Sequence, residues 1–194
     1  SVHSYYVSLL YETNISDNLI TDIKDEDCIG LDMSAKDFLI ASNDELFENK
    51  KFYRSNERIL EIRQRKLSKK QKNSNNKKKQ RLVVAKIHNK IVNQKDNYLH
   101  KVSKYLADKY KVVCIEDLNI AGMSKFSSGL SKTITLDLSF SKFVEYLDYK
   151  MKWQNKYLIK VDRWFPSSKM CSNCGQINND LTLNDRTWKC KNCE

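Results

Sequence analysis

Two pairs of cysteines near the C-terminal end constrain this 194-residue sequence more than any other feature. The pairs are Cys171-x-x-Cys174 and Cys190-x-x-Cys193, separated by the fifteen residues 175–189. Two thiolates three residues apart on a tight turn can bind one ion, and two such turns complete a tetrahedron. Gly175, directly after the first pair, suits the backbone of such a turn. We therefore predict a zinc ribbon. Its zinc is expected to be structural, because four protein ligands leave no open position.

A redox dithiol remains an alternative for the paired cysteines. The other two cysteines, Cys28 and Cys114, lie singly within apolar runs and are interpreted as small buried hydrophobic residues. No apolar run approaches the roughly 18 residues of a membrane span, and no signal-peptide pattern opens the chain. We expect a cytoplasmic protein without a membrane partner, in which metal binding is favoured over disulfides. Both ends look cut, so we expect a fragment.

The order of apolar segments predicts a mixed α/β domain, because single strands alternate with long helical segments. This order is compatible with a ribonuclease-H-like core, although many α/β domains share it. A flexible basic loop is expected at 68–79. Strands are expected at 5–10, 28–33, 38–41, 111–118 and 157–161, and helices at 52–67, 80–110 and 136–153.

Two carboxylates stand at the ends of expected strands. Asp32 lies near the end of the run CIGLDM at 28–33, and Glu116 closes the run VVCIE at 112–116. A carboxylate in a central, apolar strand is costly unless it is paired or metal-bound. Two such groups at neighbouring strand ends could share Mg²⁺, which binds carboxylates, phosphate oxygens and water. Two solvated strand ends are the alternative interpretation.

Positive charge is concentrated in one stretch. Residues 50–79 hold thirteen Lys or Arg and two Glu, a local net charge of +11, and the whole chain also has +11. Such a surface suits a phosphate backbone, although a solvated face with a disordered loop is the alternative. Base-specific recognition does not follow from it. The residues predicted to contact nucleic acid are Lys50, Lys51, Arg54, Arg58, Arg63, Arg65, Lys66, Lys69 and Lys70.

Five strings lie in order over nearly the entire chain: IGLDMSAKDF at 29–38, CIEDLNIAGM at 114–123, PSSKMCSNCG at 166–175, LTLN at 181–184 and WKCKNC at 188–193. Together they strongly resemble the TnpB family, the transposon-associated OrfB-type proteins related to miniature CRISPR type V nucleases. NQKDNYLHK at 93–101 and VDRWF at 161–165 match the same family.

The resemblance implies a RuvC-type, ribonuclease-H-like nuclease domain with a four-cysteine zinc ribbon. It further implies an RNA-guided DNA endonuclease that uses a guide RNA and Mg²⁺. By motif match, Asp32 and Glu116 correspond to catalytic, magnesium-binding residues. Cys171, Cys174, Cys190 and Cys193 match the zinc ligands. The expected regions are a remnant of an N-terminal wedge-like region at 1–27, the nuclease domain at 28–165 and the ribbon at 166–194.

The sequence departs from the family pattern in three ways. The family's third catalytic residue, an Asp, follows the last zinc cysteines, whereas this sequence stops at Glu194. The family's regions that hold guide RNA and target DNA are absent, except for the expected strand near the N-terminus. Lys95 and Asn97 replace the family's usual Arg and Asp, and Lys lacks the bidentate fork of Arg.

Two other classes of protein remain open. A nuclease-inactive, nucleic-acid-binding remnant or repressor-like derivative would explain the basic stretch without catalysis. A purely structural zinc protein would leave Asp32 and Glu116 unexplained. We expect the isolated chain to be nearly inactive as a nuclease, because two carboxylates hold a pair of metal ions poorly.

Overall fold

The computed structural model describes residues 5, 7–10, 12, 20–34, 36–119, 137–182, 185 and 187–193. Its contacts divide into two compact units, Ser1–Lys160 and Val161–Glu194. The strands are β1 (Cys28–Met33), β2 (Leu39–Ala41), β3 (Leu46–Phe47), β4 (Val112–Glu116) and β5 (Tyr157–Val161). The helices are α1 (Phe52–Ser68), α2 (Asn75–Lys109), α5 (Phe140–Trp153) and the short 3-10 helix η1 (Asp25–Asp27).

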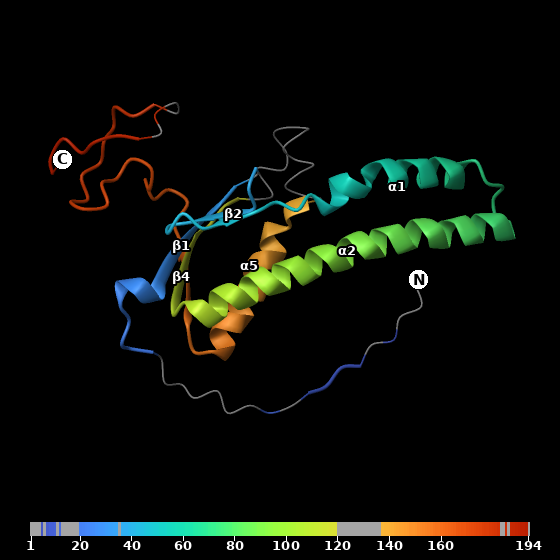
Figure 1. The fold of residues 1–194 in the computed structure, drawn as a ribbon, viewed down its shortest axis with the longest axis horizontal. Coiled ribbons are helices and arrows are strands. Elements are labelled where there is room, and N and C mark those ends of the chain that lie inside the picture. The colour runs from blue at the N-terminus through green and yellow to red at the C-terminus, as the bar shows by residue number, and fades with distance from the viewer. Residues whose placement is uncertain are drawn as a thin grey trace. The chain divides into compact units, whose positions relative to one another are not determined.

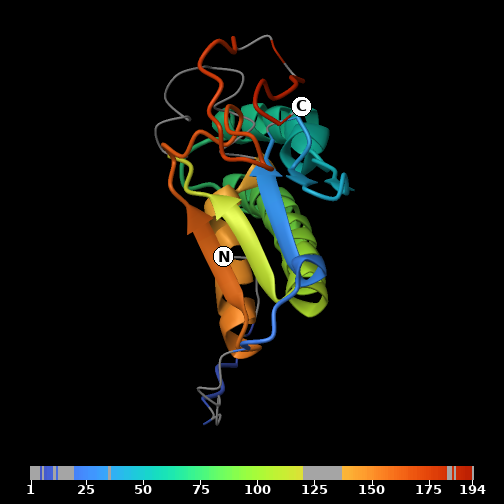
Figure 2. The same cartoon turned by 90° about the vertical axis from the view of Figure 1, so that its left-hand side faces the viewer.

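The five strands form one mixed sheet in the order β3-β2-β1-β4-β5. β1 pairs with β2 antiparallel, as expected of two strands joined by a short turn. β1 pairs with β4 in parallel, and α1 and α2 lie between these two strands in the chain. Figure 2 shows β1, β4 and β5 side by side with their arrowheads at the same end. The two strands predicted to be central, β1 and β4, are therefore central.

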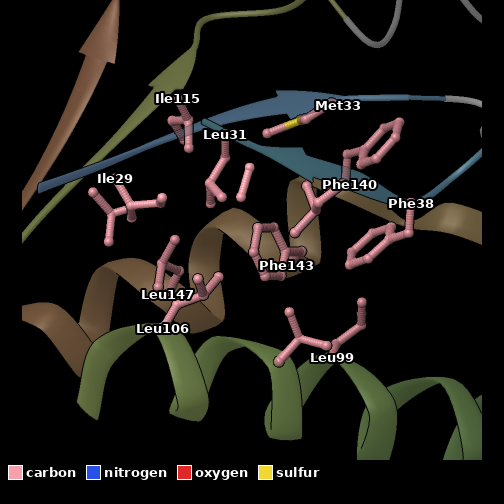
Figure 3. Close-up of a cluster of buried hydrophobic side chains, with 14 of the residues drawn as sticks. Ile29, Leu31, Met33, Phe38, Leu99, Leu106, Ile115, Phe140, Phe143 and Leu147 are labelled. Carbon is pink, nitrogen blue, oxygen red and sulfur yellow. The ribbon is translucent and has the colours of Figure 1, made fainter. Parts of the chain in front are cut away.

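The core lies between one face of this sheet and helices α2 and α5 (Figures 1 and 3). Alternate residues of β1 point into it, as the period of two in a strand requires. Three phenylalanines meet at its centre: Phe38 stacks on Phe140 at a centroid distance of 5.6 Å and contacts Phe143 edge-on at 5.2 Å. The fully buried side chains include Phe38, Leu39, Leu99, Leu106, Val113, Ile115, Phe143, Leu147 and Met151.

Helices α1 and α2 form an antiparallel hairpin (Figure 1). Leu60 of α1 is buried, as are Val84 and Ile91 of α2. The basic loop predicted at 68–79 is wrong in extent, because α2 already begins at Asn75. Ser74 explains this early start: its hydroxyl accepts a hydrogen bond from the Lys77 N–H at 3.1 Å and so caps the helix.

Three other predictions need correction. Residues 5 and 7–10 lie outside every described strand and are exposed, so no apolar burial stabilises the strand predicted there. The short edge strand β3 was not predicted. Cys28 and Cys114 are half-buried instead of buried, because both point to the sheet face opposite the core. Among the described residues, no helix has the length and apolar character needed to cross a membrane.

Candidate functional site

The sheet brings Asp32 and Glu116 to neighbouring strand ends. Leu31 of β1 is in register with Ile115 of β4, so the next residue of each strand places Asp32 beside Glu116. Because Leu31 and Ile115 are buried in the core, both carboxylates point to the opposite face of the sheet. Asp32 is exposed and Glu116 is half-buried. The fold therefore brings close together two residues that lie 84 positions apart in the sequence (116 − 32).

A cavity of about 220 Å³ adjoins Glu116 at the same end of the sheet. The cavity lies on the side of helix α5, which contributes Ser141 and Val144 to its lining. Lys160, near the end of β5, lines it as well. Lys160 is exposed and, among the described residues, has no ion-pair partner. Sequence reasoning missed Lys160, although its place near the end of a predicted strand was a usable signal.

The four paired cysteines converge. One Sγ atom from each of Cys171, Cys174, Cys190 and Cys193 lies within 4.8 Å of all the others. The Sγ–Sγ distances are 3.5 Å between Cys171 and Cys193 and 3.6 Å between Cys174 and Cys190. Tetrahedral zinc with Zn–S bonds of about 2.3 Å requires sulfurs about 3.8 Å apart, so this donor set fits one ion. The four cysteines form a candidate metal site at the place that the spacing predicted.

Tight turns position these thiols. Gly175 has a φ of 72°, in the left-handed region that favours glycine, and its N–H donates to the Cys171 carbonyl at 2.9 Å. The Cys171 N–H donates to the Gln176 carbonyl, also at 2.9 Å. On the second turn, the Asn192 N–H donates to Cys190 Sγ at 3.4 Å. Local hydrogen bonds therefore hold both turns.

The thiols perturb one another's protonation. Hydrogen bonds from Asn192 and from the backbone at Gln176 lower the pKa of Cys174 to about 6. Asn173 lowers the pKa of Cys193, but the neighbouring thiols outweigh it and raise that pKa to about 12. Four thiolates this close repel one another unless a cation lies between them, so the arrangement favours a bound metal ion.

The predicted nucleic-acid residues lie on and beside α1. Lys50 and Lys51 precede this helix, five arginines and lysines lie within it, and Lys69 and Lys70 follow it. Eight of the nine are exposed, and Arg63 is half-buried. Lys50 pairs with Glu48 at 2.6 Å, and Arg65 with Glu61 at 3.9 Å. The charges therefore form an exposed basic face along one helix.

A distant carboxylate anchors the start of this basic helix. Asp137 accepts hydrogen bonds from the N–H groups of Tyr53 (2.8 Å) and Arg54 (3.4 Å). Its second oxygen lies 3.8 Å from the Arg54 guanidinium, and only 1% of its side chain is exposed. The local residue before the helix, Lys51, provides no side-chain cap. Asp137 therefore acts as the N-cap of α1 from 84 residues away.

Two family models match the chain. The OrfB_IS605 model, described as "Probable transposase", matches residues 10–127. The model described as "Cas12f1-like, TNB domain" matches residues 140–194, which include all four clustered cysteines. Between them the two models span the strand-end carboxylates and the metal site.

Curated relatives match nearly the whole chain. A protein of Streptomyces pristinaespiralis named "Putative RNA-guided DNA endonuclease" is 35% identical over 96% of this chain and 45% of its own length. A protein of Escherichia coli (strain K12) with the same name and the suffix InsQ is 28% identical over 98% of this chain and 50% of its own length. The chain thus spans about half the length of these relatives.

A solved structure shares the fold. It is titled "Cryo-EM structure of the Cas12f1-sgRNA-target DNA complex", with a TM-score of 0.56 and 19% identity over 90% of this chain and 38% of that chain. Together with the strand order, this likeness confirms the predicted fold class: α/β, with a ribonuclease-H-like (RuvC-type) core and a small four-cysteine module.

Proposed function

The chain belongs to the TnpB family, and on that premise we propose that it forms the nuclease half of a transposon-associated, RNA-guided DNA endonuclease. Asp32 and Glu116 are the proposed catalytic carboxylates. The observation that supports this most directly is the parallel register of β1 and β4, which sets the two carboxylates side by side at the ends of central strands. A guide RNA and DNA are the proposed partners.

The chemistry of these two residues fits magnesium. Both offer carboxylate oxygens, the donors that Mg²⁺ prefers, and Asp32 is exposed to an incoming phosphate. Magnesium bound there would supply positive charge that activates a water molecule and stabilises the leaving oxygen of a phosphodiester. The two side chains would hold and orient that charge at the ends of the central strands β1 and β4. The resemblance places a third carboxylate after Cys193, and we propose that full activity needs it.

Basic groups complete the proposed site. Lys160 lines the 220 Å³ cavity on the α5 side of the sheet, next to Glu116, and its ammonium is proposed to contact a backbone phosphate of the bound strand. The exposed cations of α1 provide a phosphate-tracking surface. The four-cysteine module is proposed to hold structural zinc. We assign residues 1–27 to a remnant of the wedge-like region, 28–165 to the nuclease domain and 166–194 to the zinc ribbon.

Cleavage of labelled DNA tests the proposal. This chain and a version with a C-terminal extension that carries the family's third Asp are compared, each with Mg²⁺ and guide RNA. We expect cleavage by the extended form and almost none by the shorter one. Asp32→Ala should abolish the activity, because exposed Asp32 is a proposed magnesium ligand and contributes nothing to the core.

The controls separate catalysis from binding. Asp44→Ala removes an exposed carboxylate from the β2–β3 turn and should leave cleavage unchanged. Binding without cleavage in both lengths would replace the proposal with a nuclease-inactive, nucleic-acid-binding protein. Cleavage that persists in Asp32→Ala would show that these strand ends are not the active site.

A further inference from the structure

A second hollow, separate from the strand-end carboxylates, lies between α2 and the segment that enters α1. Its volume is about 310 Å³, at the lower end of the roughly 300–1,000 Å³ of small-molecule sites. Two aromatic, two amide and two ammonium groups surround it, and none of the described residues that line it is acidic. The lining residues are Lys50, Phe52, Gln94, Asn97, Tyr98 and Lys101.

Two aromatic rings provide its apolar surface. Phe52 and Tyr98 meet edge-on at a centroid distance of 6.0 Å, and Tyr98 also contacts Phe38 of the core at 5.7 Å. The Tyr98 hydroxyl donates a hydrogen bond to the Glu48 carbonyl at 2.7 Å. Phe52 and Tyr98 are both half-buried, so part of each ring is covered and part remains accessible. The packing therefore fixes these rings before any ligand arrives.

Polar side chains of α2 provide one wall. Gln94, Asn97 and Lys101 follow one another at intervals of three and four, which places them on one face of the helix. All three are exposed, and none makes a side-chain hydrogen bond to another described residue. Lys50 lies on the opposite wall, paired with the exposed carboxylate of Glu48. The two amides and the ammonium of this wall are therefore accessible to a ligand.

We propose that this hollow binds one unpaired nucleotide of a nucleic-acid strand. The base would lie against Phe52, since every base has a face that can stack on an aromatic ring. The amides of Gln94 and Asn97 each offer a donor and an acceptor, which suits the edge of a base. The ammonium groups of Lys50 and Lys101 suit the phosphates on either side. The proposal rests on the proposed function only in taking nucleic acid as the partner.

The neighbouring charges extend the same surface. Lys51 and Arg54 are exposed at the start of α1, within two residues of Lys50 or Phe52 in the sequence, and the basic residues of that helix continue from there. A strand whose backbone follows α1 would therefore pass the hollow, where one base can leave the strand. Binding of one base in the hollow would fix the position of the strand along the basic helix, which contacts to phosphates alone do not do.

A pair of matched double substitutions tests the site in the whole chain. Asn97→Ala with Lys101→Ala removes one amide and one ammonium from the hollow. Asn93→Ala with Lys104→Ala removes the same groups from exposed positions of α2 outside it. The probe is a short, fluorescein-labelled oligodeoxyadenylate, and its binding is followed by anisotropy in a buffer without Mg²⁺. We expect about a tenfold loss of affinity from the first pair, because it removes one amide and one charged contact, and a much smaller loss from the second.

An abasic version of the same oligonucleotide separates base binding from phosphate binding. The unsubstituted chain should bind it more weakly than the adenylate, and the Asn97/Lys101 variant should show a smaller difference between the two, because it keeps Phe52 but lacks one amide that contacts the base. Equal losses from both double variants, or equal affinity of the unsubstituted chain for both oligonucleotides, would overturn the site. Because the absence of Mg²⁺ excludes cleavage, a failed nuclease assay leaves this result unaffected, and the converse also holds.

Discussion

The two candidate metal sites are built in opposite ways. The four thiols come from two short segments, and the hydrogen bonds of the two cysteine turns join residues at most five positions apart. Asp32 and Glu116 instead come from strands joined by a long helical hairpin, and only the register of β1 against β4 sets them side by side. We expect the first site to depend on a metal ion, whereas the second depends on the packing of the whole sheet. Each should therefore fail under a different perturbation.

The largest expected effect is loss of the metal from the thiol cluster. Cys190→Ser should unfold the module while the helical circular dichroism of Ser1–Lys160 persists, because structural zinc contributes about 10–16 kcal/mol to folding in small zinc modules. Metal content and limited proteolysis measure this. Cys114→Ser, outside the cluster, is the matched control and should keep the metal. Unchanged metal content in Cys190→Ser would contradict the assigned ligands.

The sheet unit should respond instead to cavities in its core. Phe143 is fully buried among α5, α2 and the sheet, so Phe143→Ala should lower the free energy of unfolding by about 3–5 kcal/mol. Denaturant titration measures the loss, and metal content should not change. Ile159→Ala, at a side chain that is 47% exposed on β5, should cost much less. Equal losses of unfolding free energy from the two substitutions would mean that burial of Phe143 does not stabilise the sheet unit.

The same contrast between local and distant determinants decided what the sequence could predict. Short sequence patterns predict the convergence of the four cysteines and, to within one residue, the bounds of β1, β5 and α1. The start of α2 was missed, although Ser74 is a local cap that could have been recognised. Asp137 could not have been recognised as the cap of α1, because nothing near it in sequence points to that helix.

The carboxylate pair could be predicted only in part from the sequence. Each strand end was readable from apolar residues followed by Asp or Glu, but their pairing required the register between strands. Lys160 shows the same limit: its strand was predicted, whereas its place beside Glu116 depends on β5 lying next to β4. The hollow around Phe52 and Tyr98 is wholly a product of packing between distant segments.

A smaller effect is expected at the distant cap. Asp137→Ala leaves the N–H groups of Tyr53 and Arg54 without their buried acceptor, which should cost about 2 kcal/mol of unfolding free energy. Asp148→Ala, which removes the partner of Lys152 on the surface of α5, should cost less than about 1 kcal/mol. If the two substitutions lower the unfolding free energy by the same amount, the cap by Asp137 stabilises the fold no more than an exposed ion pair does.

The smallest expected effect is the loss of the stability that Asp27 contributes when the pH is lowered. A hydrogen bond from Lys111 and one from the Lys24 backbone lower the pKa of Asp27 below its ordinary 3.8. A lowered pKa in the folded state stabilises the fold above pH 3.8, and this contribution disappears as the pH falls through the folded value. The stability difference between Asp27→Asn and the unsubstituted chain should therefore shrink in that range. Asp25→Asn is the control, and a difference that grows with acid would contradict the pairing.

The most direct test of the central claim is a double-substitution cycle on divalent cation binding at the strand ends. Mn²⁺ binding is measured by electron paramagnetic resonance in the unsubstituted chain, Asp32→Asn, Glu116→Gln and the double variant, with Asp44→Asn as control. We predict that either single change removes most of the binding and that the double change removes little more, a coupling of roughly 0.5–3 kcal/mol. Additive losses, or binding unchanged in both single variants, would contradict a cation site shared by Asp32 and Glu116.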